Sequence, residues 1–405
     1  MSDPMQLTAA ISLPSGFRIG EVLPTPRTTS PPSAPPSLGP LTAFIGDWTG
    51  TGFNTIFRPD SNQTPTALPF PIPPGGTDNV LELNLTTESL SFSPSLGNIP
   101  NRGMVQGDAF LNGVPYLQAI NDVTTAGQST GIHLEPGLWV SVPSTTDPAE
   151  GPTLVRMASI PHGTTILAQG TSRTFPGAPT IPVANDGRGI TPSTTVGPGA
   201  TPGSGSPIRF QSQTAVSPDT PRIPQDLTSF IAAGTITQAM LDDPNAVLRT
   251  HNSGLVITAT SEISISTTPA SPFFGGGTEN IAFLLGNPGT LTDPRPPVQN
   301  AQTLQMTATF WIETVEHTIL VPPFVPGQPP LTLRPEAATP GQPVPTFAVR
   351  PPIPIPEPRP ITVTSTQIQY SQTVMLNFNG LTWPHVSVAT LVPAGTTPVT
   401  PPGWT

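Results

Sequence analysis

Apolar and polar residues alternate over many short stretches of the chain. Between residues 81 and 86 every second residue is leucine and the others are polar. The same period of two recurs at residues 304–312 and 367–378, and it is typical of a β-strand with one buried face. The pattern and the turn residues around it predict strands at residues 46–57, 81–86, 116–122, 131–142, 154–159, 164–171, 255–265, 304–312, 367–378 and 385–392.

Helical periodicity is confined to a small part of the chain. Residues 226–249 carry apolar side chains at helical spacing, and residues 41–45 are expected to form a short helix or turn. Asn379-Gly380 is a hairpin turn signal between the last two strands. Eight or more strands without alternating helices favour an antiparallel barrel or sandwich. We therefore expect an all-β fold, an antiparallel β-barrel of the calycin or lipocalin type with long Pro/Gly-rich loops and one short helical segment.

Prolines and glycines divide the chain into parts. The sequence holds 60 prolines and 37 glycines, which are concentrated between the predicted strands. Residues 1–40 are interpreted as a Pro-rich arm and residues 396–405 as a tail. Residues 41–395 are expected to form a single barrel domain with insertions at about 172–254 and 321–360.

Charge narrows the classes of partner. The 14 basic residues are all arginine, and with 24 acidic residues they leave a net charge of −10. Without clustered Lys and Arg to neutralise phosphates, nucleic acid is not an expected partner. The chain has no cysteine and no lysine, which excludes disulfides, thiolate ligands and Schiff-base chemistry. Residues 1–20 lack the features of a secretory signal, and no apolar stretch is long enough to span a membrane, so we expect a cytoplasmic protein.

Five histidines are the main candidates for chemistry, since the usual catalytic motifs are absent. His133 and His385 lie in predicted strands with apolar neighbours, and a neutral imidazole on a barrel wall can serve haem iron as its single protein ligand. Each histidine is also compatible with a structural role. Haem needs an apolar pocket, and the candidate aromatic lining residues are Phe44, Trp48, Phe53, Trp139, Phe310, Tyr370 and Trp383.

Two segments carry a resemblance to a known family. The first predicted strand contains the pattern GxWxGxG, and residues 370–375 with 381–388 form the closing strand pair that includes His385. The four residues of the pattern are Gly46, Trp48, Gly50 and Gly52. Together these segments resemble the nitrobindin-like haem-binding β-barrels, with large Pro-rich insertions. Residues 132–139, which include His133, also look like the central histidine-containing strand of that family.

The resemblance implies a function. It makes His385 the candidate axial ligand of haem b, and it implies a ferric haem that reacts with peroxynitrite, nitric oxide or peroxide, so that a peroxynitrite isomerase or peroxidase-like activity is left open. Trp48, Gly46, Gly50, Gly52 and His133 are carried over as candidate cofactor-binding residues. The same tryptophan and glycines could instead serve folding, by plugging the barrel and letting the strand bend.

Two other functions are kept open beside haem binding. The first is a haem-free barrel that carries a lipid or another apolar small molecule, in which His385 is a packed wall residue. The second is a structural or assembly protein whose proline-rich segments bind neighbours, and for which a homo-oligomer is an expected form.

Overall fold

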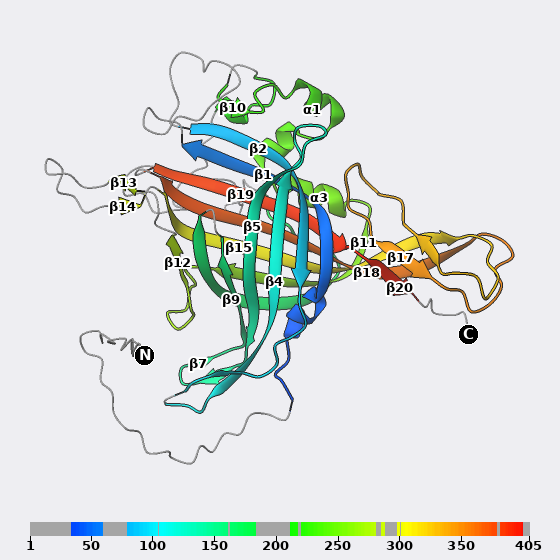
Figure 1. Cartoon of the computed structure of the whole chain (residues 1–405), viewed down its shortest axis with the longest axis horizontal. Helices are drawn as coiled ribbons and strands as arrows, with labels where there is room; N and C mark the ends of the chain where they lie inside the picture. The colour runs from blue at the N-terminus through cyan, green and yellow to red at the C-terminus, as the bar shows by residue number, and fades with distance from the viewer. Residues whose placement is uncertain are drawn as a thin grey trace, which may run out of the picture. The chain divides into compact units, whose positions relative to one another are not determined.

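Ten antiparallel strands form one closed barrel in the computed structural model of the chain (Figure 1). Each strand pairs with the next barrel strand along the chain, and the last pairs with the first, so the barrel is a simple meander. The expected all-β antiparallel barrel is therefore confirmed. The barrel strands are β1 (Gly46–Pro59), β2 (Asn79–Phe92), β4 (Ala109–Asp122), β5 (Thr130–Val142), β8 (Thr153–Ser159), β9 (Thr164–Pro176), β11 (Val256–Ser266), β15 (Ala301–Val321), β18 (Arg359–Phe378) and β19 (Leu381–Pro393).

The structure describes most of the chain from residue 34 onward. The predicted turn at Asn379-Gly380 lies outside the described residues. Two short strands, β3 (Ile99–Asn101) and β12 (Gly277–Asn280), pair with β4 and β9. Two separate two-stranded sheets are formed by β6 (Thr145–Thr146) with β7 (Ala149–Glu150) and by β13 (Leu285–Asn287) with β14 (Val298–Gln299). The described ranges are 34–59, 79–103, 105–160, 163–183, 211–217, 220–280, 285–287, 298–299, 301–378 and 381–399.

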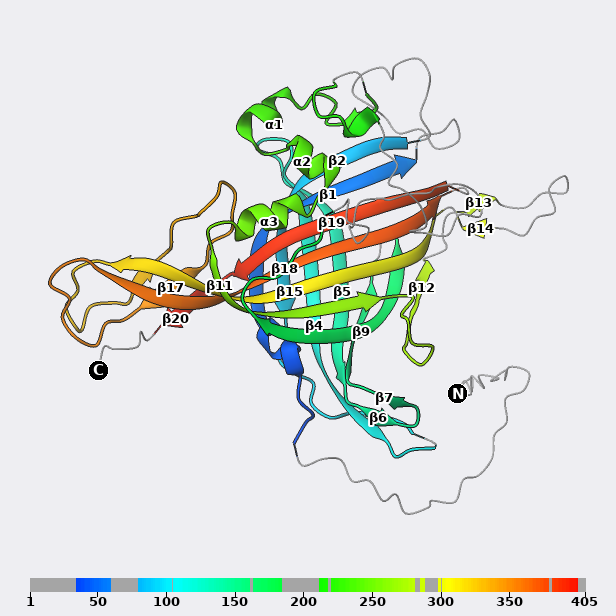
Figure 2. The same cartoon turned by 180° about the vertical axis from the view of Figure 1, so that it is seen from behind.

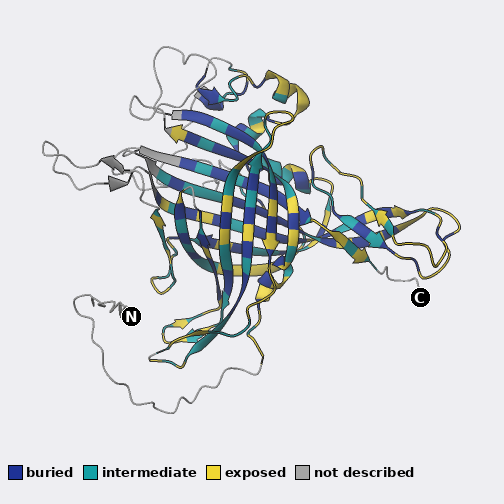
Figure 3. Cartoon of the chain, in the orientation of Figure 1, coloured by how far each residue is buried: buried dark blue, intermediate teal, exposed yellow. Residues whose placement is uncertain are grey.

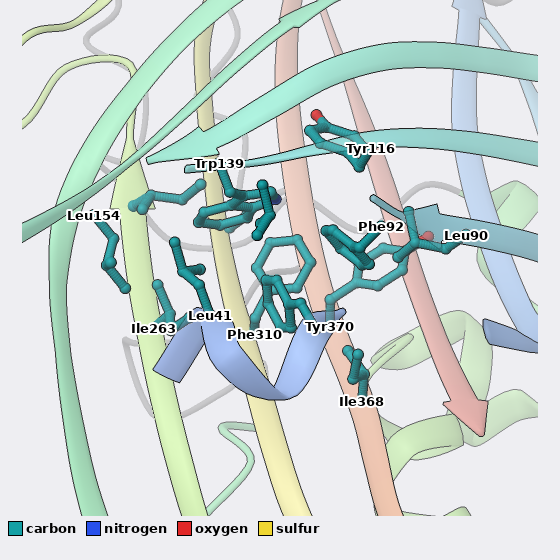
Figure 4. Packing of buried hydrophobic residues seen from close by; sticks show 14 of the residues in the cluster. Leu41, Leu90, Phe92, Tyr116, Trp139, Leu154, Ile263, Phe310, Ile368 and Tyr370 are labelled. Carbon is teal, nitrogen blue, oxygen red and sulfur yellow. The ribbon is translucent and has the colours of Figure 1, made fainter. Parts of the chain in front are cut away.

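One end of the barrel interior is closed by aromatic side chains and by η1 (Gly39–Phe44), the short helix expected near residue 41. Leu41 and Phe44 of η1 are fully buried in this cluster, and Figure 4 shows Leu41 among Trp139, Phe310 and Ile263. The ring of Phe44 stacks on Phe92 with centroids 4.7 Å apart, and it meets Trp139 edge-on at 5.6 Å. We call this part the closed end.

Three short helices cover part of the outer barrel wall, where the sequence predicts its only helical segment. They are α1 (Thr228–Ala233), α2 (Gln238–Asp242) and α3 (Ala246–Asn252), with η3 (Gln211–Gln213) and β10 (Arg222–Ile223) beside them. Figure 2 shows them next to β1, β2 and β19. Leu227, Leu241 and Leu248 pack against outward-facing Phe53 and Val388 in a second apolar cluster. Phe53 of β1 and Leu83 of β2 are fully buried there, and Figure 3 colours the described residues by their burial.

A polar network also holds α3 to the barrel. Asn252 Nδ2 donates to Glu313 Oε1 at 2.9 Å, and Gln367 Nε2 donates to Glu313 Oε2 at 2.5 Å. His251 Nδ1 lies 2.9 Å from Thr390 Oγ1. Burial raises the pKa of Glu313 to about 7, although both amide donors lower it in part. The helical insertion is thus attached to the barrel through the carboxyl group of Glu313. In the described structure no cationic group lies within hydrogen-bond distance of this carboxyl group.

The second proline-rich segment is more ordered than expected. β15 and β18 continue beyond the barrel and pair with each other as far as Val321 and Arg359. Beside them β16 (Leu331–Leu333), β17 (Thr346–Val349) and β20 (Thr396–Val399) form a three-stranded sheet. A third apolar cluster, which includes Phe324 and Phe347, fills the space between them. The expected insertion at 321–360 and the first residues of the expected tail therefore contribute strands and a small core, because apolar residues alternate between the prolines.

Candidate functional site

A layer of buried polar side chains crosses the barrel interior next to the closed end. Its members come from alternate, inward-facing positions of β2, β4, β5, β8 and β18. Buried charges are rare unless they are paired, so this layer is the most unusual part of the interior. We call it the polar layer: Glu88, Tyr116, Gln118, His133, Glu135, Arg156, Tyr370 and Gln372.

One half of the polar layer is an ion pair. Arg156 Nη2 lies 2.5 Å from Glu135 Oε1, and both side chains are almost completely buried. The Tyr116 hydroxyl donates to the same carboxylate, and Arg156 Nη1 donates to Gln372 Oε1 at 2.7 Å. Burial by itself raises the pKa of Glu135, but the charge of Arg156 and the hydrogen bonds from His133 and Tyr116 outweigh it and lower the pKa to about 2. Glu135 is therefore ionised across the physiological range.

The other half of the polar layer is a carboxyl group with neutral partners. Glu88 accepts hydrogen bonds from Gln118 Nε2 at 2.5 Å and from the Tyr370 hydroxyl at 2.8 Å. Burial raises the pKa of Glu88 to about 7, because these bonds and the more distant charges of His133 and Arg156 offset only part of the desolvation. Glu88 can thus gain or lose a proton near neutral pH.

His133 connects the ion pair to the part of the barrel that solvent reaches. Its Nε2 lies 3.1 Å from Glu135 Oε2, while 17% of its side chain remains exposed. Glu135 itself is fully buried. The hydrogen bond between His133 and Glu135 therefore links the buried ion pair to a residue that solvent reaches.

Beyond the polar layer, away from the closed end, the barrel wall carries His385. His385 lies opposite Ile56 of β1 and Val374 of β18 in the ladders. Directly opposed residues project to the same face, and Val374 packs against the interior cluster. His385 therefore faces inward. We call its inward-facing neighbourhood the His385 wall: Asn54, Ile56, Glu82, Asn84, Gln372, Val374, His385 and Ser387.

The His385 wall differs from the closed end in its exposure. Ile56, Val374, His385 and Ser387 are all partly exposed, although they face the barrel interior. At its rim Arg58 Nη1 pairs with Glu82 Oε2 at 3.0 Å. Most of the wall consists of amide, hydroxyl, imidazole and carboxyl groups. A small molecule that approaches this wall therefore meets hydrogen-bonding groups.

The candidate residues of the first strand lie elsewhere. Trp48 is buried in the closed end and donates from Nε1 to the Phe44 carbonyl at 2.7 Å. A Cβ atom on Gly50 would stand 1.9 Å from the Thr390 carbonyl oxygen, so glycine lets β1 approach β19 closely. Gly46 has a φ of 129°, which other residues rarely adopt. The structure therefore places His133 in the polar layer and His385 beyond it, whereas Gly46, Trp48 and Gly50 of β1 have packing and backbone roles.

Gly50 is the ladder partner of Glu88 in the polar layer, and Gly52 is the ladder partner of Thr86. A Cβ atom on Gly52 would meet the Val388 carbonyl oxygen at 2.3 Å and the Thr86 hydroxyl at 2.8 Å. Ala389 is its ladder partner on β19. Glycine at this position therefore keeps the β1 backbone close to its neighbours.

The sequence reasoning did not identify Glu88, Gln118, Glu135 or Arg156 as site residues. A signal existed for Gln118 and Arg156, because each carries a long polar side chain at a position whose alternate neighbours are apolar, whereas Glu88 and Glu135 each have a polar alternate neighbour. It was not decisive, since alternation alone leaves open which face of a strand lines the interior. Leu81 and Leu83 illustrate this, because they pack outside the barrel against the helices.

The surroundings of His385 can be compared with what haem requires. Five of the seven aromatic side chains expected to line a haem pocket are instead packed at the closed end, where the rings of Trp139 and Phe310 have centroids 5.1 Å apart, and the side chain of Trp383 lies outside the described part of the structure. Phe53 faces outward against the helices. Around His385 the described wall is largely polar, whereas haem is held by apolar contacts on both faces. These residues fit a polar ligand better than a haem plane.

Neither a search for metal-binding groups nor a comparison with known proteins assigns a function to the chain. Within the described residues no group of three or more His, Asp or Glu side chains is arranged to hold a metal ion. In the same part of the chain no helix is long and apolar enough to cross a membrane. Comparison with protein-family models, with curated proteins and with solved structures finds no match for the chain.

Proposed function

We propose that the barrel binds a small molecule with hydrogen-bonding groups against the His385 wall, above the polar layer. The observation that carries this proposal is the partial exposure of inward-facing residues at this end, where Ser387 and His385 are reached by solvent while the closed end is fully packed. A barrel wider than eight strands has more interior than side chains easily fill. The function is therefore that of a carrier or receptor for a small ligand.

The chemistry of the wall supports a ligand with both polar and apolar parts. Asn54, Asn84 and Gln372 offer amide donors and acceptors, while Ile56 and Val374 offer apolar contact. Ligand sites commonly combine a few placed polar groups with apolar lining. Glu88 adds a group in the floor that exchanges a proton near pH 7, so binding of a charged ligand would depend on pH.

A chamber-filling variant tests this proposal. Ser387→Phe places a large side chain on the inner wall beside His385, whereas Thr362→Phe adds the same ring at an exposed position outside the barrel. A panel of small metabolites is screened by thermal shift against the full chain. A ligand that binds only the folded protein raises its Tm by mass action. We therefore expect the screen to find a metabolite that raises the Tm of the wild type and of Thr362→Phe but not that of Ser387→Phe. Equal stabilisation of all three proteins would contradict the proposal.

Haem is the second candidate ligand, and the inward orientation of His385 favours it. If haem were bound, His385 would hold its iron through a ring nitrogen, and the haem would supply the chemistry with peroxynitrite, nitric oxide or peroxide that the family resemblance implies. Hemin titration tests this candidate, with His385→Ala beside the wild type. A Soret band that weakens in His385→Ala would support haem, and identical spectra would reject His385 as the ligand.

Four further expectations from the sequence stay predictions. They are a lipid-carrying barrel, an assembly role for the proline-rich segments, a homo-oligomer and a cytoplasmic location. Metabolites that stabilise the protein only when they carry long alkyl chains would favour the lipid carrier over the polar ligand proposed here.

A further inference from the structure

The outer face of the barrel carries a groove that is separate from the interior site. It has a volume of about 470 Å³ and lies over β9, β11 and β15. Pro182 lines it, and so do Pro269 and Phe274 from the segment that follows β11. This volume is within the range of pockets that hold small ligands. The groove does not depend on the proposed interior ligand, because different side chains form it.

The floor of the groove is an array of hydroxyl groups. Ser264 of β11 lies opposite Thr171 of β9 and Thr309 of β15, and Ser266 lies opposite Thr307. Directly opposed side chains on neighbouring strands are about 5 Å apart. Hydroxyl groups from three strands are therefore presented side by side on one surface.

Part of this array is available to a ligand. Ser264 Oγ and Thr309 Oγ1 are 3.5 Å apart, which is a long contact for two hydroxyls. Thr171 and Thr307 are exposed, and their hydroxyls make no hydrogen bond to another side chain or backbone group in the described structure. A hydroxyl can both donate and accept, so these positions suit a partner that itself carries hydroxyl groups.

The groove lining contains no charged side chain. Its other polar group is the amide of Gln169, which accepts from the Gly275 N–H at 2.5 Å. Its apolar lining includes prolines and the ring of Phe274, which can contact the C–H face of a sugar ring. Neither an anion nor a cation would find an opposite charge in this lining.

From this combination we propose that the groove binds a neutral polyhydroxylated ligand of the saccharide class. Hydroxyl groups of the ligand bond the Thr171, Ser264 and Thr307 side chains, and its ring packs on the apolar lining. The absence of charge in the lining sets the selectivity, because a sugar acid would lose hydration at its carboxylate without gaining an ion pair.

The experiment uses the full chain and saccharide probes. Maltose and cellobiose are titrated by saturation-transfer NMR and calorimetry, with glucuronate as the charged comparison. Thr171→Val and Thr307→Val remove a hydroxyl while keeping the shape and β-propensity of the side chain. Thr318→Val makes the same change at an exposed site of β15 outside the groove and serves as the matched control.

We expect at least one neutral disaccharide to bind, glucuronate to bind more weakly, and affinity to fall about tenfold in the double variant Thr171→Val/Thr307→Val, as for the loss of two hydrogen bonds. Thr318→Val should bind as the wild type does. The proposal is overturned if neither disaccharide binds, or if binding is unchanged in the double variant. Titration of the Ser387→Phe variant with the same saccharides separates the two sites, since this interior substitution should leave saccharide binding in the groove intact.

Discussion

The two ends of the barrel interior are built from different kinds of side chain on the same ten strands. At the closed end, η1 inserts Leu41 and Phe44 among aromatic rings, and the inward-facing residues are buried. At the His385 end, the inward-facing positions carry Asn, Ser, Glu and His, and several of them stay partly exposed. One barrel thus combines an end that is fully packed with an end whose inward-facing side chains are polar and partly exposed, and the polar layer lies between them.

The polar layer itself contains two carboxyl groups in contrasting states. Glu135 faces a guanidinium and is held ionised, whereas Glu88 faces an amide and a phenol and has a pKa of about 7. Both are buried, so burial alone does not decide their charge. The neighbour decides it, which means that each can be changed by a substitution at its partner.

The largest effect is expected from breaking the ion pair. Arg156→Leu would leave Glu135 buried without its counter-charge, and such a change costs about 3–5 kcal/mol of unfolding free energy. Urea denaturation monitored by tryptophan fluorescence measures it. The double variant Arg156→Leu/Glu135→Leu should recover much of the loss, since it removes both charges. A loss below about 1 kcal/mol in the single variant would show that water or another group compensates the carboxylate.

Removing the plug at the closed end should have the next largest effect. Phe44→Ala deletes a fully buried ring and is expected to lower the unfolding free energy by about 3–4 kcal/mol. The matched change at the other end, Ile56→Ala, removes a partly exposed side chain and should cost about 1 kcal/mol. Equal losses in the two variants would mean that the two ends are equally packed, against the contrast drawn here.

The protonation of Glu88 should appear as a pH-dependent stability. Its pKa rises from 4.5 to about 7 on folding, so its stabilising contribution is complete below about pH 4.5 and is lost as the pH rises through about 7. Glu88→Gln does not ionise, and its unfolding free energy relative to the wild type should therefore increase by on the order of 2 kcal/mol between about pH 5 and pH 8. Parallel pH profiles for the two proteins would contradict this assignment.

Glu313 provides the control for that measurement, because its pKa is also raised to about 7 on the outer wall. Glu313→Gln should give a pH-dependent difference of the same sign. Only Glu88→Gln should also change the pH dependence of ligand binding against the His385 wall. If both variants alter binding equally, the effect is one of stability and not of the interior site.

The smallest effect on stability is expected at His385. Because its side chain is partly exposed, His385→Ala should change the unfolding free energy by less than about 1 kcal/mol, while reducing the affinity of the interior ligand found in the metabolite screen. A large loss of stability with unchanged ligand affinity would make His385 a structural residue. The measurement pairs denaturation with calorimetric titration on the same protein samples.

The sequence predicted the strand framework well. Every strand predicted from alternation corresponds to a barrel strand, and the helices fall within residues 226–249 or just beyond them. The small core of the 321–360 segment was not predicted, because its apolar residues are separated by prolines and each strand there has only three or four residues. Of the interior site, His133 and His385 were singled out, whereas Glu88 and Arg156 were not.

The period of each strand and the order of strands along the chain follow from the sequence alone, because alternation and turn residues act locally. Which face of a strand became the interior was decided by the tertiary structure. Leu83 and Asn84 are neighbours on β2 and point to opposite faces. The helices cover the outside of the barrel, so Leu83 packs outward against them while Asn84 faces inward. The polar layer likewise required the tertiary structure, since the pairing of β2 with β4 places Gln118 beside Glu88, and the closed barrel brings Tyr370 of β18 within hydrogen-bond distance of the same carboxyl group.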